Sequence, residues 1–166
     1  MTIALKPALL MDMPDGKLPG FYAQIVKALA AKAPLFDRDK ELLIFDSLGE
    51  REMAYPIMHQ YKIPYENMDL LLLPATVYAR PDFTDYGFVS RSGLSYVYAE
   101  SVYLFTLHHI EPAAEPIQAL QQFEEHLLAS IPQAEVIYIV DLQYEELMKR
   151  IAQAYNCELR PFPKPL

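Results

Sequence analysis

The hydrophobic positions in the C-terminal third follow the most regular pattern of the chain. Residues 135–140 read EVIYIV, a short apolar run typical of a buried strand. After Asp141, apolar residues recur at helical spacing through Leu147 and Ile151, and Asn156 suits the left-handed residue that ends many helices. The run CELRPF then predicts a returning strand. The pattern predicts strand, helix and strand in succession, with Leu147 and Ile151 buried against the first strand.

Prolines divide the N-terminal half. Residues 2–10 are apolar enough for a strand, and Pro7, which lacks an N–H, predicts that this strand bends or lies at a sheet edge. From Pro19 the apolar residues follow a helical stripe, which Pro34 ends. The run ELLIFDSLG over 41–49 fits either a helix or a strand, and both interpretations stay open.

The middle of the chain is rich in strand-forming residues. Pro56 argues against a helix around it, and DLLLLPATVYA over 69–79 predicts a strand. The runs GLSYVYA and SVYLFTLHHI, separated by Glu100 and Ser101, predict a hairpin whose second strand is covered on both faces. A helix is expected from about 115 to 130. No internal repeat is visible.

Charge is unevenly distributed. The chain carries a formal net charge of −8, yet no lysine or arginine lies between Arg91 and Lys149. The nine carboxylates of this stretch are Glu100, Glu111, Glu115, Glu124, Glu125, Glu135, Asp141, Glu145 and Glu146. Such a segment repels nucleic acid and attracts basic molecules, so a basic protein partner is expected and nucleic acid is not.

Length and composition indicate one globular domain over residues 1–166, with 52% hydrophobic and 22% charged residues. No run of about 18 apolar residues exists, and the N-terminus does not resemble a secretion signal, so a cytoplasmic protein without a membrane span is expected. Cys157, the single cysteine, excludes an internal disulfide and is interpreted as a core residue. A homodimer is left open.

The predicted order of elements, together with YIVDLQYEELMKRIAQAYNCEL over 138–159, resembles the GNAT-type N-acetyltransferase superfamily. The resemblance implies an α/β (α+β) fold with a central mixed sheet of about six strands flanked by about four helices. Members of that family bind acetyl-coenzyme A through a glycine-bearing loop at the start of a helix. Many also use a tyrosine as a general acid.

The chain departs from the family at these chemical positions. Where the resemblance places the cofactor loop, residues 109–120 read HIEPAAEPIQAL, without glycine or arginine. The family's tyrosine position falls on Ala152. A scaffold without the usual cofactor chemistry is therefore expected, and no cofactor is predicted.

His108, His109 and Glu111 are the candidate catalytic residues, at the end of a predicted central strand. Neighbouring strand residues point to opposite faces, so the two histidines are poorly placed to chelate one metal. The interpretation preferred here is one packed and one solvated histidine. No metal site is predicted.

Three functions fit the sequence. The first is a non-catalytic binding or regulatory protein with an acidic surface for a protein partner. The second is a divergent acetyl-coenzyme A-dependent N-acyltransferase that uses His108, His109 or Glu111. The third is an acidic chaperone-like or DNA-mimicking inhibitor. The missing loop glycines and the acidic stretch favour the first, so a binding protein is expected rather than an enzyme.

Overall fold

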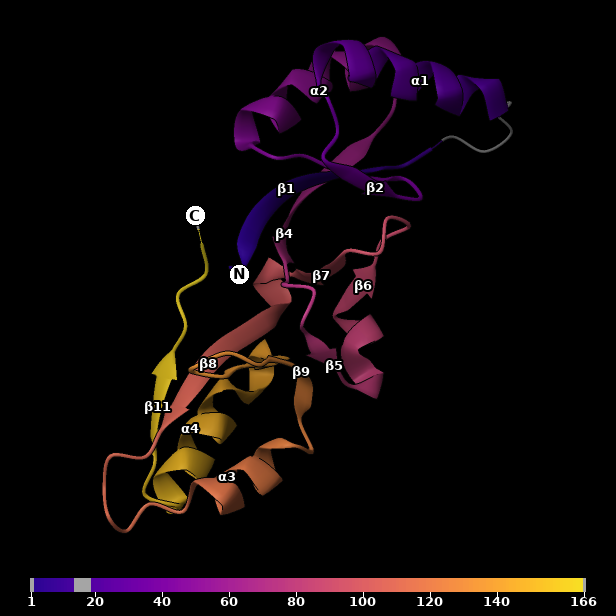
Figure 1. Ribbon diagram of the computed structural model, residues 1–166. Helices are drawn as coiled ribbons and strands as arrows, with labels where there is room; N and C mark the ends of the chain where they lie inside the picture. Colours follow the sequence, from indigo (N-terminus) through magenta and orange to yellow (C-terminus); the bar gives the residue numbers. More distant parts are fainter. Residues whose placement is uncertain (1, 14–18, 166) are drawn as a thin grey trace.

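A computed structural model describes residues 2–13 and 19–165, which form two lobes (Figure 1). Four α-helices occur in the described residues: α1 (Pro19–Lys32), α2 (Leu48–Gln60), α3 (Pro116–Phe123) and α4 (Glu145–Ala154). Within the same residues no helix has the length and apolar character needed to cross a membrane.

The described strands form two sheets. Sheet A has six strands in the order β2 (Asp37–Asp39), β3 (Leu42–Ile44), β1 (Ala4–Met11), β4 (Tyr65–Leu72), β7 (Ser95–Tyr98) and β6 (Gly87–Val89). Sheet B has five strands in the order β11 (Glu158–Pro161), β8 (Val102–His108), β10 (Ile137–Asp141), β9 (Leu127–Ile131) and β5 (Tyr78–Ala79). Short 3₁₀ turns are η1 (Pro81–Asp85), η2 (Ala99–Ser101) and η3 (Leu142–Tyr144).

One topology occurs twice in the chain. Residues 4–72, here module 1, run β1-α1-β2-β3-α2-β4, and residues 102–161, module 2, run β8-α3-β9-β10-α4-β11. In each module the four strands lie in the order second, third, first, fourth, as in the split β-α-β arrangement of ferredoxin-like domains. The structure therefore contains a repeat of topology that the sequence did not reveal.

Two short signals accompany this repeat. Ile-Phe-Asp at 44–46 begins at the last residue of the third strand in module 1, and Ile-Val-Asp at 139–141 ends the third strand in module 2. Each second helix is followed by a residue of positive φ, Lys62 at 55° and Asn156 at 59°. The helix-ending conformation predicted for Asn156 is confirmed.

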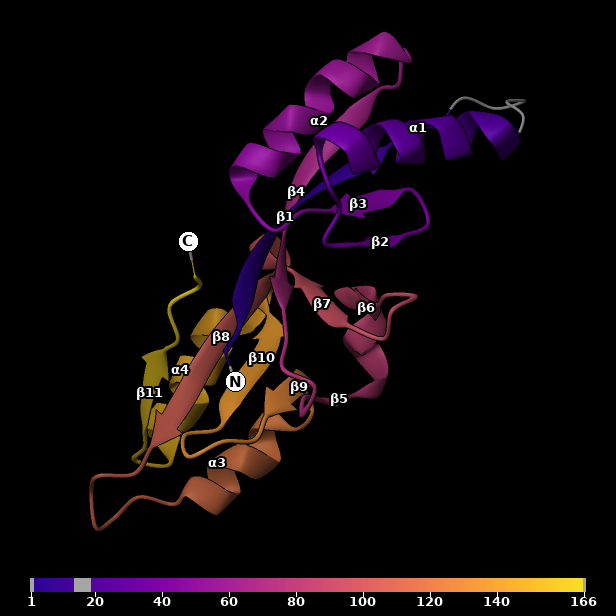
Figure 2. The ribbon, with the colours of Figure 1, turned by 45° about the horizontal axis from the view of Figure 1, so that its top comes forward.

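In each module, two helices cover one face of the sheet (Figures 1 and 2). In module 1, Ile25 and Leu29 of α1 and Met58 of α2 pack with Leu9 and Leu43 of the sheet. The predicted helical stripe from Pro19 is thus a core face.

The helices of module 2 differ in part from the prediction. Met148 and Ala152 form the buried centre of α4, whereas Leu147 and Ile151 are half-buried at its sides. Cys157 is also half-buried beside this core. The helix predicted over 115–130 ends at Phe123, because the apolar residues 127–131 pair in sheet B instead.

The remaining face of sheet B packs against sheet A. Leu71 and Val97 from sheet A share a buried cluster with Leu104 and Ile139 from sheet B. Phe162, which follows β11, packs against the same cluster. Strand β8 is consequently covered on both faces, as predicted.

The α+β class is confirmed, but the GNAT-like architecture is wrong. A mixed sheet contains at least one parallel pair, and every strand pair among the described residues is antiparallel. The strands also belong to two sheets rather than one. The predicted hairpin around Glu100 is wrong for the same reason, since η2 carries the chain from β7 in sheet A to β8 in sheet B.

The predicted edge position of the strand with Pro7 and the predicted absence of a helix around Pro56 are also wrong. Pro7 lies in the central strand β1, where its carbonyl accepts a hydrogen bond from the Phe45 N–H at 2.8 Å. Its missing N–H faces the same side, at the end of the β1–β3 ladder, so the proline removes at most the one bond that would be the reciprocal of this contact. Pro56 lies inside α2, on an exposed position of a helix that Ser47 caps and whose other face is buried.

Candidate ligand groove

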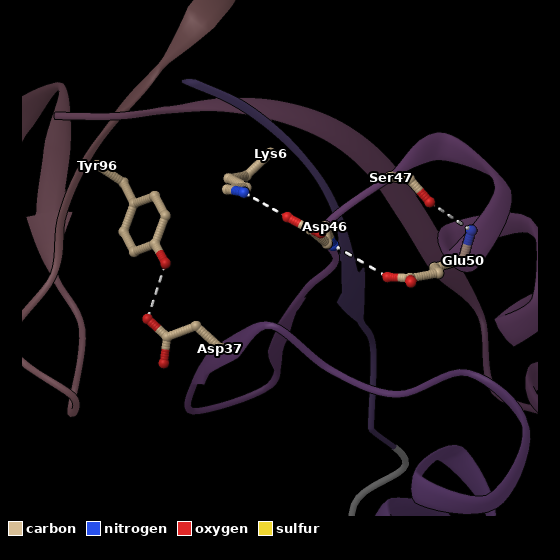
Figure 3. Close-up of polar contacts among 6 residues, drawn as sticks. All are labelled: Lys6, Asp37, Asp46, Ser47, Glu50 and Tyr96. Atoms are coloured by element: carbon tan, nitrogen blue, oxygen red, sulfur yellow. Dashed lines mark hydrogen bonds and ion pairs between the residues drawn. The ribbon is translucent and has the colours of Figure 1, made fainter. Parts of the chain in front are cut away.

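The face of sheet A opposite α1 and α2 is concave. Its centre is a cluster of Ala8, Leu42, Ile44, Leu70 and Tyr96, drawn from four of the six strands. The sheet curls far enough for the Tyr96 hydroxyl, on β7, to donate a 2.8 Å hydrogen bond to Asp37 on β2 (Figure 3). Strands at opposite sides of the sheet are thereby joined across the concave face.

Asp37 is a buried carboxylate, 8% exposed, with several donors around it. Burial alone would raise the pKa of Asp37. Hydrogen bonds from the Ser90, Tyr96 and Ser92 hydroxyls and from the Arg38 N–H outweigh burial and hold that pKa below its usual value. Burial and the same carboxylate raise the pKa of Tyr96. Asp37 is therefore a stable anion that fixes the curl of the sheet.

A second polar contact lies beside the cluster. The Lys6 ammonium donates to Asp46 at 2.5 Å and lies 4.0 Å from the centre of the Phe36 ring. The Asp46 N–H donates to Glu50, whose own N–H donates to the Ser47 hydroxyl at the start of α2 (Figure 3). Lys6 is 8% exposed, so these bonds compensate for burying its charge.

A groove of about 910 Å³ opens at the rim of this concave face, and we call it the sheet A groove. Its apolar lining comes from Leu10, Leu42, Met68, Phe88, Val89 and Tyr98. Its polar lining comes from Asp39, Lys40, Glu41 and Thr84. Leu10 on the central strand β1 is 37% exposed, and Val89 is 56% exposed, so apolar surface faces solvent there.

Carboxylates surround the apolar floor. Asp39 and Glu41 flank Lys40 in the turn between β2 and β3. Glu66 pairs with Leu10 across β1 and β4, on the face that also carries Met68. Two carboxylates, Asp39 and Glu41, therefore line the groove beside one lysine, and Glu66 follows next to the lining residue Leu10.

The turn between β2 and β3 is held in place. Lys40 adopts a φ of 53°, and its carbonyl accepts a 2.7 Å hydrogen bond from the Tyr22 hydroxyl of α1. The acidic rim of the groove is consequently attached to the helical layer.

The candidate residues from the sequence lie elsewhere. The His108 Nε2 atom is 3.0 Å from the Thr106 hydroxyl and 4.0 Å from a Glu135 oxygen, at the end of β8. His109 and Glu111 are exposed in the loop before α3. None of the three lines the sheet A groove. Across residues 2–13 and 19–165, no group of three or more His, Cys, Asp or Glu side chains is arranged to hold a metal.

Four of the nine carboxylates in the acidic stretch accept hydrogen bonds within the chain. Glu124 accepts two hydrogen bonds from Arg80, Asp141 accepts from Tyr86 and Gln143, and both Glu145 and Glu146 accept from Lys149. These carboxylates are therefore less free for a partner than their density in the sequence suggests.

The sequence carries no local signal for the groove. Asp37 and Tyr96 are 59 positions apart, and the lining residues come from six strands and two connecting turns.

Comparisons with known proteins do not establish a family. No protein-family model and no curated protein matches the chain. One solved structure that it matches is titled the regulatory subunit of aspartate kinase from Thermus thermophilus, in a ligand-free form. The two share 11% identity with a TM-score of 0.29, over 92% of this chain and 95% of that chain. At this TM-score the match assigns nothing to this chain. The antiparallel pairing of the described strands in two separate sheets removes the basis for the GNAT resemblance.

Proposed function

We propose that this chain is a non-catalytic binding protein and that the sheet A groove takes a basic segment of a partner protein. The observation that carries the proposal is the combination of an exposed apolar floor with a rim of carboxylates in a groove of about 910 Å³. Pockets that bind ligands commonly occupy roughly 300–1,000 Å³ and combine an apolar lining with a few polar groups.

The negative charge at the rim of the groove favours a positively charged partner. Asp39, Glu41 and Glu66 outnumber Lys40, so a cation beside an apolar side chain complements this surface. A lysine or arginine next to a leucine or phenylalanine supplies both features. The acidic stretch over 92–148 would add a long-range attraction for such a segment.

A binding role also fits the polar groups nearby. Asp37 and Lys6, the buried charges closest to the cluster, are each held by partners within the protein. Groups held in this way support the shape of the groove rather than exchange protons with a ligand. The proposal requires no cofactor.

Two dansyl-labelled pentapeptides test the proposal, one of sequence Lys-Leu-Lys-Phe-Lys and one in which glutamate replaces each lysine. We expect the basic peptide to bind saturably, with an affinity that falls as salt rises, and the acidic peptide to bind at least tenfold more weakly. Fluorescence titration of the dansyl group measures both.

Val89→Lys locates the binding site, because it places a cation in the groove at a position that is 56% exposed. Met53→Lys is a matched control, since Met53 is 54% exposed on α2, away from the groove. We expect only Val89→Lys to weaken the basic peptide, by about tenfold. No binding of the basic peptide at millimolar concentration, or an equal effect of both substitutions, would refute the proposed site.

A further inference from the structure

One wall of the sheet A groove is attached to module 2. Thr84, Phe88 and Val89 form this wall and belong to the connection between the modules. The opposite wall and the floor, which include Leu10 and Leu42, belong to module 1. Through β7 this wall is hydrogen-bonded to β4 of module 1, and through η1 it contacts β9 of module 2, so it bridges the two modules.

The connection is fixed to module 2 at its start. Strand β5 pairs with β9, and the Arg80 N–H donates to the Leu128 carbonyl at 2.9 Å. The Arg80 guanidinium donates to both carboxylate oxygens of Glu124, at 2.8 and 3.1 Å. This bidentate pair also holds the end of α3.

A second attachment lies directly before the groove wall. The Tyr86 hydroxyl donates to Asp141, at the end of β10. The other oxygen of Asp141 accepts a 3.0 Å hydrogen bond from the Gln143 N–H in η3, which leads into α4. Tyr86 thus joins the groove wall to the strand-to-helix corner of module 2.

The same residue is bonded to sheet A through its backbone. The Tyr86 carbonyl accepts a 3.0 Å hydrogen bond from the N–H of Tyr98, which lines the groove. The next residue, Gly87, lies so close to β7 that an added Cβ would be 2.2 Å from the Tyr96 carbonyl oxygen. A displacement of Asp141 would consequently move Tyr86 and, through its backbone contacts with β7, the groove wall.

We propose that binding in the sheet A groove is coupled to the position of module 2 through the Tyr86–Asp141 hydrogen bond. The inference rests on the proposed function for the identity of the ligand. A ligand that contacts both walls favours one arrangement of the modules, and by linkage whatever displaces the β10–α4 corner changes the affinity of the groove. Module 2 is then the regulatory part of the protein and module 1 the binding part.

The test uses the full chain and the basic dansyl peptide. Tyr86→Phe removes the hydroxyl and keeps the ring, and Asp141→Asn removes the charge. We expect each to weaken the peptide by about fivefold or more, the lower end of typical coupling between sites, and the double variant to weaken it no more than either alone. Tyr55→Phe, in a tyrosine stacked on Tyr65 at the helical side, is the control and should leave the affinity unchanged.

Amide hydrogen exchange provides a readout that needs no ligand. Without peptide, Tyr86→Phe should speed exchange both in residues 87–89 and in residues 141–145, whereas Tyr55→Phe should not. Equal peptide affinity of wild type and Tyr86→Phe would overturn the coupling. If the peptide fails to bind wild type, the proposed ligand is wrong, and the coupling then stands or falls on whether exchange changes in both segments.

Discussion

Replacing Tyr96 with phenylalanine tests the contact that joins the two sides of sheet A. The Tyr96 hydroxyl donates to Asp37 at 2.8 Å, and the whole residue is buried. The ring packs 5.2 Å from Phe88, and phenylalanine preserves this packing. The substitution therefore removes one donor from a buried carboxylate and changes little else.

The expected cost follows from the charge of the acceptor. Hydrogen bonds to ionised groups contribute about 1.5–3 kcal/mol, roughly twice the value for neutral pairs. Asp37 keeps its bonds from the Ser92 hydroxyl at 2.9 Å and the Arg38 N–H at 2.8 Å, so its charge remains partly compensated. We expect Tyr96→Phe to lower the free energy of unfolding by about 2 kcal/mol, and the melting temperature by roughly 4–8 °C.

Urea denaturation followed by circular dichroism measures this difference between about pH 3 and 8. Because the pKa of Asp37 is lowered in the folded protein, its stabilisation is present above the unfolded pKa and is lost as pH falls through the folded pKa. Tyr96 contributes part of that lowering. The difference between wild type and Tyr96→Phe should therefore be constant near neutral pH and shrink below about pH 4.

Tyr98→Phe is the matched control on the same strand, since the Tyr98 ring also lies beside Phe88 but its hydroxyl is not part of the Asp37 network. A loss of less than about 0.5 kcal/mol in Tyr96→Phe, or an equal loss in both variants, would show that the hydrogen bond across sheet A does not stabilise the protein.

Three further predictions concern the core, a glycine and a tyrosine. Met148→Ala should cost about 2–5 kcal/mol in urea denaturation and Ile151→Ala clearly less, because Met148 is fully buried and Ile151 is half-buried; equal losses would contradict this packing. Gly87→Ala should strongly lower the melting temperature, since the added Cβ would lie 2.2 Å from the Tyr96 carbonyl oxygen. Gly20→Ala is the control, because Gly20 has open space around it, and similar melting temperatures of the two variants would show that β6 is placed wrongly. The hydrogen bond to Asp141 raises the pKa of Tyr86 to about 12. The difference between the absorbance titrations of wild type and Tyr86→Phe should therefore show a phenol that ionises near 12 and not near 10.

Periodic patterns in the sequence determined several elements correctly. The helices α1 and α4, the buried strands β8 and β10, and the left-handed Asn156 were all predicted. Each depends on contacts within a few residues or on one amphipathic face, and such information is local.

Prolines and short apolar runs led to wrong predictions because the structure that they adopt depends on the strands and helices around them. Pro7 is tolerated in a central strand because the neighbouring strand β3 has ended at that point. Pro56 is tolerated in α2 because the opposite face, including Met58, is buried. Residues 127–131 became a strand because β10 and β5 offered partners on both sides. Tertiary contacts outweighed local propensity in each case.

Only the tertiary structure decided the division into two sheets and the existence of the groove. The pairing of β4 with β7 and of β8 with β10 and β11 sets which sheet each strand joins, and these strands are far apart in the sequence. The bond between Asp37 and Tyr96 then closes the concave face across 59 positions. The sequence by itself determined which helices and strands have an apolar face. Which of these faces pack together depends on contacts between segments that are distant in the sequence, and a local pattern does not encode those contacts.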